Sequence, residues 1–172
     1  MLIREATYND VLAVARLHAD SWRNTYRDIL SDDYLRFRVE KEREQLWNKR
    51  LSQPSAEQRV LIAEEIDETL GFICIVGNAD PVWGVLIDNL HVRHDKKGQG
   101  IGKALMRQAA AWTLQNYPGS GIFLHVVQEN VAAYEFYQHV GASIHPSAPW
   151  HTPDGQVVPE VLCAWKNPET LL

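Results

Sequence analysis

The chain has 172 residues and a net charge of −5, and 45% of its residues are hydrophobic and 23% charged. A chain of this length buries a core without disulfides or metal ions, so we expect one domain spanning residues 1–172. The acidic balance excludes a general nucleic-acid binder, which would carry a basic stripe, and it suits a cationic substrate such as an amine.

The first half of the chain predicts a strand, two helices and three strands. Residues 2–6 form the first strand, and Thr7 and Asp10 have the spacing of a capping box for the helix that follows. The apolar positions of that helix share one face and are Val11, Leu12, Val14, Ala15, Leu17 and Trp22. A second helical region begins at Ser31-Asp32-Asp33, carries Leu46 and Trp47, and extends to Arg50. After a turn at 54–57, residues 60–63 and 70–76 form a hairpin through Asp67-Glu68-Thr69, and residues 83–92 form a third strand.

The second half predicts helices alternating with strands. A helix over 101–117 is stopped by Pro118-Gly119, and a strand over 122–127 precedes a helix over about 131–140. The last strand, 158–165, follows the turn Pro153-Asp154-Gly155. This order is typical of a mixed α/β domain with helices on both faces of a sheet.

Features tied to cellular location point to the cytoplasm. Cys74 and Cys163 lie in apolar strand segments, which is typical of buried free thiols in a reducing compartment. Charges at Arg4 and Glu5 interrupt any signal peptide, and no apolar run approaches the roughly 20 residues of a membrane span. We therefore expect a cytoplasmic protein with no membrane contact.

The most informative segment is the glycine-rich stretch 97–103, between a predicted strand and a predicted helix. Gly98, Gly100 and Gly102 leave a row of backbone N–H groups without side chains at the positive end of the helix dipole, which favours a pyrophosphate. The stretch is not a P-loop, because Ala104 occupies the position where a P-loop has Ser or Thr. It is not a dinucleotide-binding fingerprint either, because the third glycine would fall on Lys103 or on Leu105, depending on which pair of glycines begins the motif. A plain tight turn before a helix is the structural alternative.

Two motifs resemble the GCN5-related N-acetyltransferase (GNAT) family. The acetyl-coenzyme A loop of this family begins with Gln or Arg, continues with any two residues and Gly, and ends with any residue and then Gly or Ala. Here the loop reads Lys97-Gly98-Gln99-Gly100-Ile101-Gly102, with Lys97 in place of Gln or Arg. The family's second motif is matched by Asn130, Ala133, Phe136-Tyr137 and Gly141-Ala142, with Ala142 in place of Phe. The resemblance runs from end to end and implies a mixed, mostly antiparallel central sheet of about six or seven strands flanked by about four helices.

The resemblance also implies acetyl-CoA as co-substrate and no metal. The implied cofactor-binding residues are Leu90, His91, Val92, Lys97, Gly98, Gln99, Gly100, Ile101, Gly102, Lys103, Asn130 and Tyr137. Asn130 also suits an N-cap, and Gly141 suits a helix C-cap. His91, His94 and His151 lack metal-ligand spacing.

The implied reaction is direct attack of a neutral amine on the acetyl thioester. Pantetheine would lie where the strand ending at Val92 diverges from the strand through 124–127, and backbone N–H groups near His91 and Val92 would stabilise the thioester oxygen. Tyr137 would protonate the departing thiolate. A core aromatic role is the alternative for Tyr137.

The sequence leaves the identity of the general base open. Relatives with a glutamate base have it where this chain has Leu86, and Asp88 shares that strand face. Asp88 is a candidate for direct or water-mediated proton removal, and a strand-end polar role is its alternative. Glu160 and His125 are weaker candidates, and a bulk-water relay without a dedicated base is equally compatible.

The acceptor would be the amine of a small molecule or a peptide. The candidate substrate-binding residues are Trp22, Tyr26, Asp88, His125 and Trp150. Trp22 and Tyr26 are four residues apart and share a helix face, and aromatic walls suit an apolar or cationic group. Core packing is the alternative for these aromatics. An exposed last strand is compatible with a homodimer.

Two other functions remain open. The missing glutamate at Leu86 is compatible with a catalytically idle acyl-CoA binding or sensing domain of the same fold, whereas Tyr137 favours an enzyme. A nucleotide-binding protein is a third hypothesis, and it predicts protection by ATP or NAD instead of coenzyme A.

Overall fold

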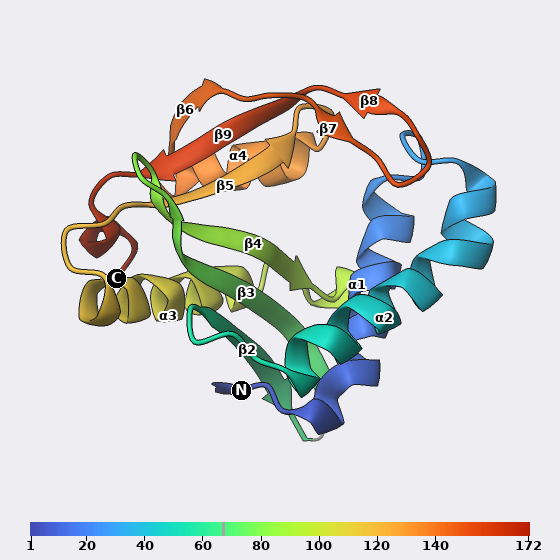
Figure 1. Cartoon of the computed structure of the whole chain (residues 1–172), viewed down its shortest axis with the longest axis horizontal. Helices are drawn as coiled ribbons and strands as arrows, with labels where there is room; N and C mark the ends of the chain where they lie inside the picture. Colours follow the sequence, from blue (N-terminus) through green and yellow to red (C-terminus); the bar gives the residue numbers. More distant parts are fainter. Residues whose placement is uncertain (67) are drawn as a thin grey trace. The chain divides into compact units, whose positions relative to one another are not determined.

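The computed structural model of the chain describes residues 1–66 and 68–172 and shows a mixed α/β fold (Figure 1). A seven-stranded sheet has the order β1-β2-β3-β4-β5-β9-β6, and β7 and β8 form a separate ribbon. The strands are β1 (Leu2–Glu5), β2 (Gln58–Glu65), β3 (Glu68–Asp80), β4 (Gly84–Val92), β5 (Ile122–Val127), β6 (Ser143–Pro146), β7 (Trp150–His151), β8 (Val157–Val158) and β9 (Glu160–Trp165). The α-helices are α1 (Val11–Thr25), α2 (Val39–Ser52), α3 (Ile101–Asn116) and α4 (Val131–His139). The expected fold class is confirmed: β1–β2, β5–β9 and β6–β9 are antiparallel, and β4–β5 is parallel.

The chain divides into two compact units, each described here by itself. Unit 1 comprises Met1–Cys74 and Asn89–Leu105. Unit 2 comprises Ile75–Asp88 and Met106–Leu172. The strands β3 and β4 and the helix α3 each contribute to both units.

In unit 1, the predicted capping box starts the first helical segment. The Thr7 backbone N–H donates to the Asp10 carboxylate over 2.7 Å, and its hydroxyl donates over 3.0 Å. Arg4 donates to both oxygens of Asp10 at 2.9 and 2.8 Å. These hydrogen bonds, that of Arg4 above all, lower the pKa of Asp10 to about 2. The carboxylate therefore joins β1 to the short 3-10 turn η1 (Tyr8–Asp10) that leads into α1.

The core of unit 1 lies between the helix pair α1–α2 and the strands β2 and β3. The two helices run side by side (Figure 1), and α1 contributes most of the predicted apolar face. The core residues are Val11, Val14, Ala15, Leu17, Trp47, Val60, Ile62, Phe72 and Cys74. Leu12 was expected on this face, but it is 51% exposed, because one step along a helix rotates a side chain by about 100° from Val11.

The first turns of α3 lie on the other face of β3, where Gly71 permits a close approach. A Cβ at Gly71 would lie 2.9 Å from the His91 carbonyl oxygen and 3.3 Å from Cγ2 of Ile101. Phe72, the next residue, points to the α1–α2 side, since successive strand residues alternate between faces. At this point β3 is therefore covered on both faces, in agreement with the helices predicted on both faces of the sheet.

In unit 2, β5 and β9 pair over their full length, and α4 closes with a glycine cap. Gly141 has φ +87°, and the N–H groups of Gly141 and Ala142 donate to the carbonyls of Gln138 and Tyr137, each over 3.0 Å. This is a Schellman arrangement, which confirms the predicted C-cap. The Trp165 indole donates to the Val140 carbonyl over 2.9 Å and attaches the end of α4 to β9.

Several element boundaries differ from the sequence prediction. The predicted strand 158–165 is split into β8 and β9 at Pro159, which has no N–H to donate to a ladder. Strands β6 and β7 were not predicted separately, and a π-helical turn, η2 (Tyr34–Arg38), precedes α2. The hairpin turn predicted through Asp67 lies partly outside the described residues, and Glu68 and Thr69 already belong to β3.

Both cysteines are buried free thiols, as expected. Within residues 1–66 and 68–172, no helix combines the length and apolar character needed to cross a bilayer.

We predict that Gly71→Ala destabilises the protein by about 1–3 kcal/mol, because the new methyl group must displace the His91 carbonyl or α3. Thr69→Ala, a partly exposed position on the same strand, is the control and should cost about 0.5 kcal/mol or less. Urea unfolding measures both. Equal free energies of unfolding for Gly71→Ala and the unmodified protein would show that α3 does not need this contact.

Candidate functional site

The glycine-rich stretch forms a loop that ends in the first turn of α3. Gly98 and Gly100 have φ of +78° and +82°, a conformation that favours glycine, and a Cβ at either would meet nothing within 4 Å. The Ala104 N–H donates to the Gly100 carbonyl over 3.0 Å and is the first donor of the α3 hydrogen-bond ladder. The N–H groups of residues 101–103 come before it, so they have no acceptor within the helix. Three backbone donors at the positive end of a 16-residue helix can hold an anion.

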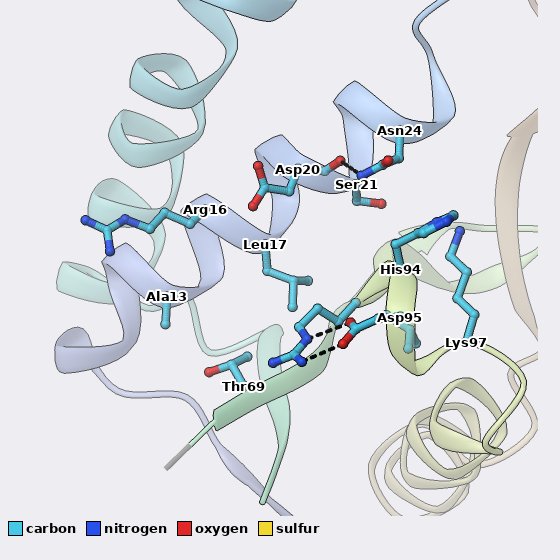
Figure 2. A pocket seen from close by; sticks show the side chains of 12 residues that line it. Ala13, Arg16, Leu17, Asp20, Ser21, Asn24, Thr69, His94, Asp95 and Lys97 are labelled. Atoms are coloured by element: carbon cyan, nitrogen blue, oxygen red, sulfur yellow. Dashed lines mark hydrogen bonds and ion pairs between the residues drawn. The ribbon is translucent and has the colours of Figure 1, made fainter.

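A cavity of about 580 Å³ lies next to this loop in unit 1 (Figure 2). One wall is the face of α1 that presents Leu17, Ser21 and Asn24, and the opposite wall is the segment from Val92 to Lys97. Val92 and Lys97 are expected cofactor-binding residues, so the structure places the predicted phosphate loop beside a cavity that can take a ligand.

Most of the charges at the cavity are paired. Arg93 donates to both oxygens of Asp95, at 2.8 and 2.7 Å, and to Glu68 at 3.1 Å. Asp20 accepts from Arg23 over 2.9 Å. The hydrogen bonds of Arg93 hold the pKa of Asp95 to about 2, so this carboxylate is charged at neutral pH.

Behind the Ser21 wall lies a pair of neighbouring histidines, His18 and His91, whose rings are tilted by 32° to one another. The rings of His18 and His91 are 4.5 Å apart between centroids, and the His91 ring lies 5.3 Å from that of Phe72. Nδ1 of His91 is 2.8 Å from the Ser21 hydroxyl. Nδ1 of His18 accepts from the Trp47 indole over 3.0 Å, so a neutral His18 carries its proton on Nε2.

Both histidines are neutral at physiological pH. Burial, reinforced by the nearby Lys97 and Arg43, lowers the pKa of His91 to about 3. Burial and the neighbouring His91 hold the pKa of His18 well below its ordinary value. Two uncharged imidazoles therefore lie behind the Ser21 wall of the cavity.

In unit 2, Asn130 and Tyr137 have clear structural roles. The Asn130 side chain accepts from the Ala133 N–H over 3.3 Å and caps α4, as predicted. The Tyr137 side chain is 8% exposed, and its ring lies 5.3 Å from that of Phe136 and 6.0 Å from that of Trp165. Their roles toward a cofactor stay predictions.

The candidate general bases of unit 2 are Asp88, His125 and Glu160, on strands β4, β5 and β9. The parallel ladder between β4 and β5 consists of the pairs Val85–Ile122 and Leu86–Phe123. Asp88, two residues after Leu86, is exposed on the same face of β4. His125 is exposed on β5, with Nδ1 2.8 Å from the Ser147 hydroxyl, and burial raises the pKa of Glu160 on β9.

The aromatic candidates for the acceptor pocket differ in exposure. The Trp22 side chain is 9% exposed, and the Arg43 guanidinium lies over its ring, 4.3 Å from the centroid. Tyr26 packs edge-on against Trp22 at 5.6 Å, which confirms that the two share a face. Trp150 lies on β7, opposite Val158. The face of Trp22 is thus already used by a cation of the protein itself.

Sequence reasoning missed Ser21, Asn24 and the buried His18. The 3–4 residue spacing from Leu17 through Ser21 to Asn24 was the available signal, because it places all three on one helix face. Nothing in the sequence indicates that the His91 imidazole turns toward this helix. In the part of the chain that the structure describes, no group of three or more His, Cys, Asp or Glu residues is placed to hold a metal ion.

Comparison with known proteins identifies the family. The profile of the Acetyltransferase (GNAT) family matches residues 19–142, so the chain belongs to this family of acetyltransferases. A curated relative is the protein named uncharacterized N-acetyltransferase YuaI of Bacillus subtilis (strain 168). It is 29% identical over 138 residues, which cover 79% of this chain and 76% of YuaI.

Solved structures share the fold. The PaiA N-acetyltransferase of Thermoplasma acidophilum, solved in complex with coenzyme A, has a TM-score of 0.75 and 20% identity, covering 95% of this chain and 98% of its own. YncA of Salmonella typhimurium, solved with acetyl-CoA, has a TM-score of 0.66 and 17% identity, covering 96% and 92%. These structures agree with the fold expected from the sequence.

We predict that the histidine pair makes the protein acid-labile below pH 6.5. Between the folded pKa of His91, about 3, and its ordinary value of 6.5, the unfolded chain binds the extra proton. Stability is therefore complete above pH 6.5 and falls as the pH decreases, by about 1.4 kcal/mol per pH unit for each such proton. His91→Gln should flatten this dependence between pH 6 and 5, as measured by urea unfolding.

His139→Gln, which removes an exposed imidazole at the end of α4, is the control and should leave the pH dependence unchanged. An equally steep dependence in His91→Gln would mean that His91 does not carry it.

Proposed function

We propose that this protein transfers the acetyl group of acetyl-CoA to the primary amine of a small molecule or peptide, by direct attack of the amine on the thioester. The observation that carries the proposal is the open glycine loop at the start of α3, in a chain of the GNAT family. The loop offers backbone N–H donors to the diphosphate, and Lys97 adds a positive charge beside them. The relatives solved with coenzyme A or acetyl-CoA support the choice of this co-substrate.

In the proposed reaction, the amine nitrogen forms a bond to the acetyl carbon while the carbon–sulfur bond breaks. Backbone N–H groups near His91 and Val92 stabilise the charge that develops on the thioester oxygen. The Tyr137 hydroxyl gives its proton to the departing sulfur. The products are the N-acetylated amine and coenzyme A with a free thiol.

The proton that the nitrogen loses passes to Asp88, directly or through water. The exposure of Asp88 on β4 supports access by solvent, and Glu160 and His125 are the secondary candidates. A relay through bulk water without a dedicated base gives the same products.

A non-catalytic acyl-CoA binding or sensing domain is the second candidate, because Leu86 stands where relatives with a glutamate base carry that glutamate.

Release of free thiol from acetyl-CoA separates the two functions. We suggest four amines as acceptors: n-butylamine, phenethylamine, glycinamide and a peptide with a free N-terminus. Amine-dependent thiol release supports the enzyme, and tight acetyl-CoA binding without turnover of any amine supports the sensor. Protection by ATP or NAD instead of coenzyme A would favour a nucleotide-binding protein.

We predict that Gly100→Glu abolishes acetyl-CoA binding while the protein still folds, because the new carboxylate repels the diphosphate at an open position. Gly100→Gln is the matched control: it has the same size and the same backbone strain at φ +82°, but no charge. Calorimetric titration should give a dissociation constant at least 10-fold weaker for Glu than for Gln. Equal affinities would contradict the assignment of the loop.

We predict that Tyr137→Phe lowers kcat by about 10²-fold, the low end for loss of a general acid, with little change in acetyl-CoA affinity. Tyr134→Phe, which removes a hydroxyl from the preceding turn of α4, is the control and should retain full activity. An unaltered kcat in Tyr137→Phe would leave this tyrosine with a packing role only.

A further inference from the structure

Two side-chain oxygens of α1 face the unit 1 cavity one helical turn apart. Ser21 and Asn24 both line the cavity, and Figure 2 shows both side chains on the same stretch of α1. Neither belongs to the family motifs in the sequence.

The hydrogen bonds within the protein orient both groups. The Asn24 Nδ2 group donates to the Asp20 carbonyl over 2.7 Å, which assigns the amide and leaves the oxygen as its accepting atom. The Ser21 hydroxyl is held by Nδ1 of His91 at 2.8 Å. Whichever of the two donates in that bond, at least one lone pair of the Ser21 oxygen remains to accept a hydrogen bond.

The two histidines behind this wall add no positive charge to it. The His91 and His18 imidazoles are neutral, because burial lowers the pKa of each, so the support for Ser21 does not repel a basic nitrogen. The α1 residues that line the cavity before Ser21 include the apolar Leu17 and Ala13, and the charged Arg16 and Asp20 line it as well. A ligand on this wall therefore meets two accepting oxygens at one end and an aliphatic surface at the other.

A primary amine with an aliphatic stem fits this arrangement. It has two N–H donors and one lone pair, so two accepting oxygens can engage both N–H bonds and leave the lone pair free to attack. Resting on the proposed acetyltransferase function, we propose that Ser21 and Asn24 bind and orient the amino group of an aliphatic primary amine in this cavity. Ser21 is then a positioning residue that His91 holds in place.

Lys97 lines the same cavity, at the end of the segment that leads into the glycine loop. In the proposed function, a diphosphate bound on that loop offsets the charge of Lys97 near the amine.

The test uses n-butylamine and acetyl-CoA with the full-length protein. Ser21→Ala and Asn24→Ala should each raise the KM for n-butylamine about 10-fold, the effect of one lost hydrogen bond of about 1.4 kcal/mol. The dissociation constant for acetyl-CoA should stay within about twofold. Ser21→Thr, which keeps the hydroxyl, should restore most of the affinity, a result that a merely structural role for Ser21 would not produce.

Ser143→Ala is the matched control, because the Ser143 hydroxyl lies 2.9 Å from Nε2 of His145 on an exposed strand outside the cavity. It should leave both constants unchanged. Thermal melting shows that each variant is folded at the assay temperature.

The outcomes separate this inference from the proposed function. Unchanged amine KM in both cavity variants would overturn the inference. So would a weakened acetyl-CoA affinity with unchanged amine KM, which would assign the cavity to the cofactor. Turnover of other amines but not n-butylamine would overturn the aliphatic class and leave the enzyme intact. The absence of turnover with all four amines would instead contradict the proposed function.

Discussion

The close contact between α3 and β3 at Gly71 is the constraint on which the phosphate loop depends. No side chain separates β3 from Ile101 and the His91 carbonyl at this point, so the first turn of α3 lies directly against the strand. The loop 97–100 must then turn within a few residues to join β4 to α3, and Gly98 and Gly100 adopt positive φ to do so. The same tight connection presents the backbone N–H groups of residues 101–103 at the start of a long helix. The close packing of α3 and the exposed row of backbone donors thus follow from one short connection.

The buried histidines link the core of unit 1 to the cavity wall. His18 packs between helices and strands, with Trp47 and Phe72 as ring neighbours, and His91 extends these ring contacts to the Ser21 hydroxyl. Burial of His18, and partial burial of His91 near Lys97 and Arg43, lower the pKa of both imidazoles, because a charged ring there would lose hydration and meet like charge. The wall consequently keeps its hydrogen-bonding pattern over the physiological pH range.

Unit 2 places its motif residues by a different means. Asn130 begins α4 and Gly141 ends it, so the two ends of this nine-residue helix are determined locally. Trp165 then attaches the helix end to β9 through the Val140 carbonyl. Tyr137 is held inside this framework with its ring beside Trp165, so a role in proton transfer and a role in packing are compatible in one residue.

The features that depend only on neighbouring residues could be predicted from the sequence. The capping box at Thr7, the glycine loop, the helix end at Gly141 and the strand over 122–127 are local patterns of turn chemistry and side-chain alternation. The family motifs predicted the fold class for the same reason, since their spacing reflects one strand–loop–helix connection. Tertiary structure alone decided that Leu12 is exposed, that Arg43 covers Trp22 and that the His91 ring contacts Ser21, 70 positions away in the sequence. Those outcomes depend on which helix packs against which strand, and the cavity beside α1 is a product of that packing.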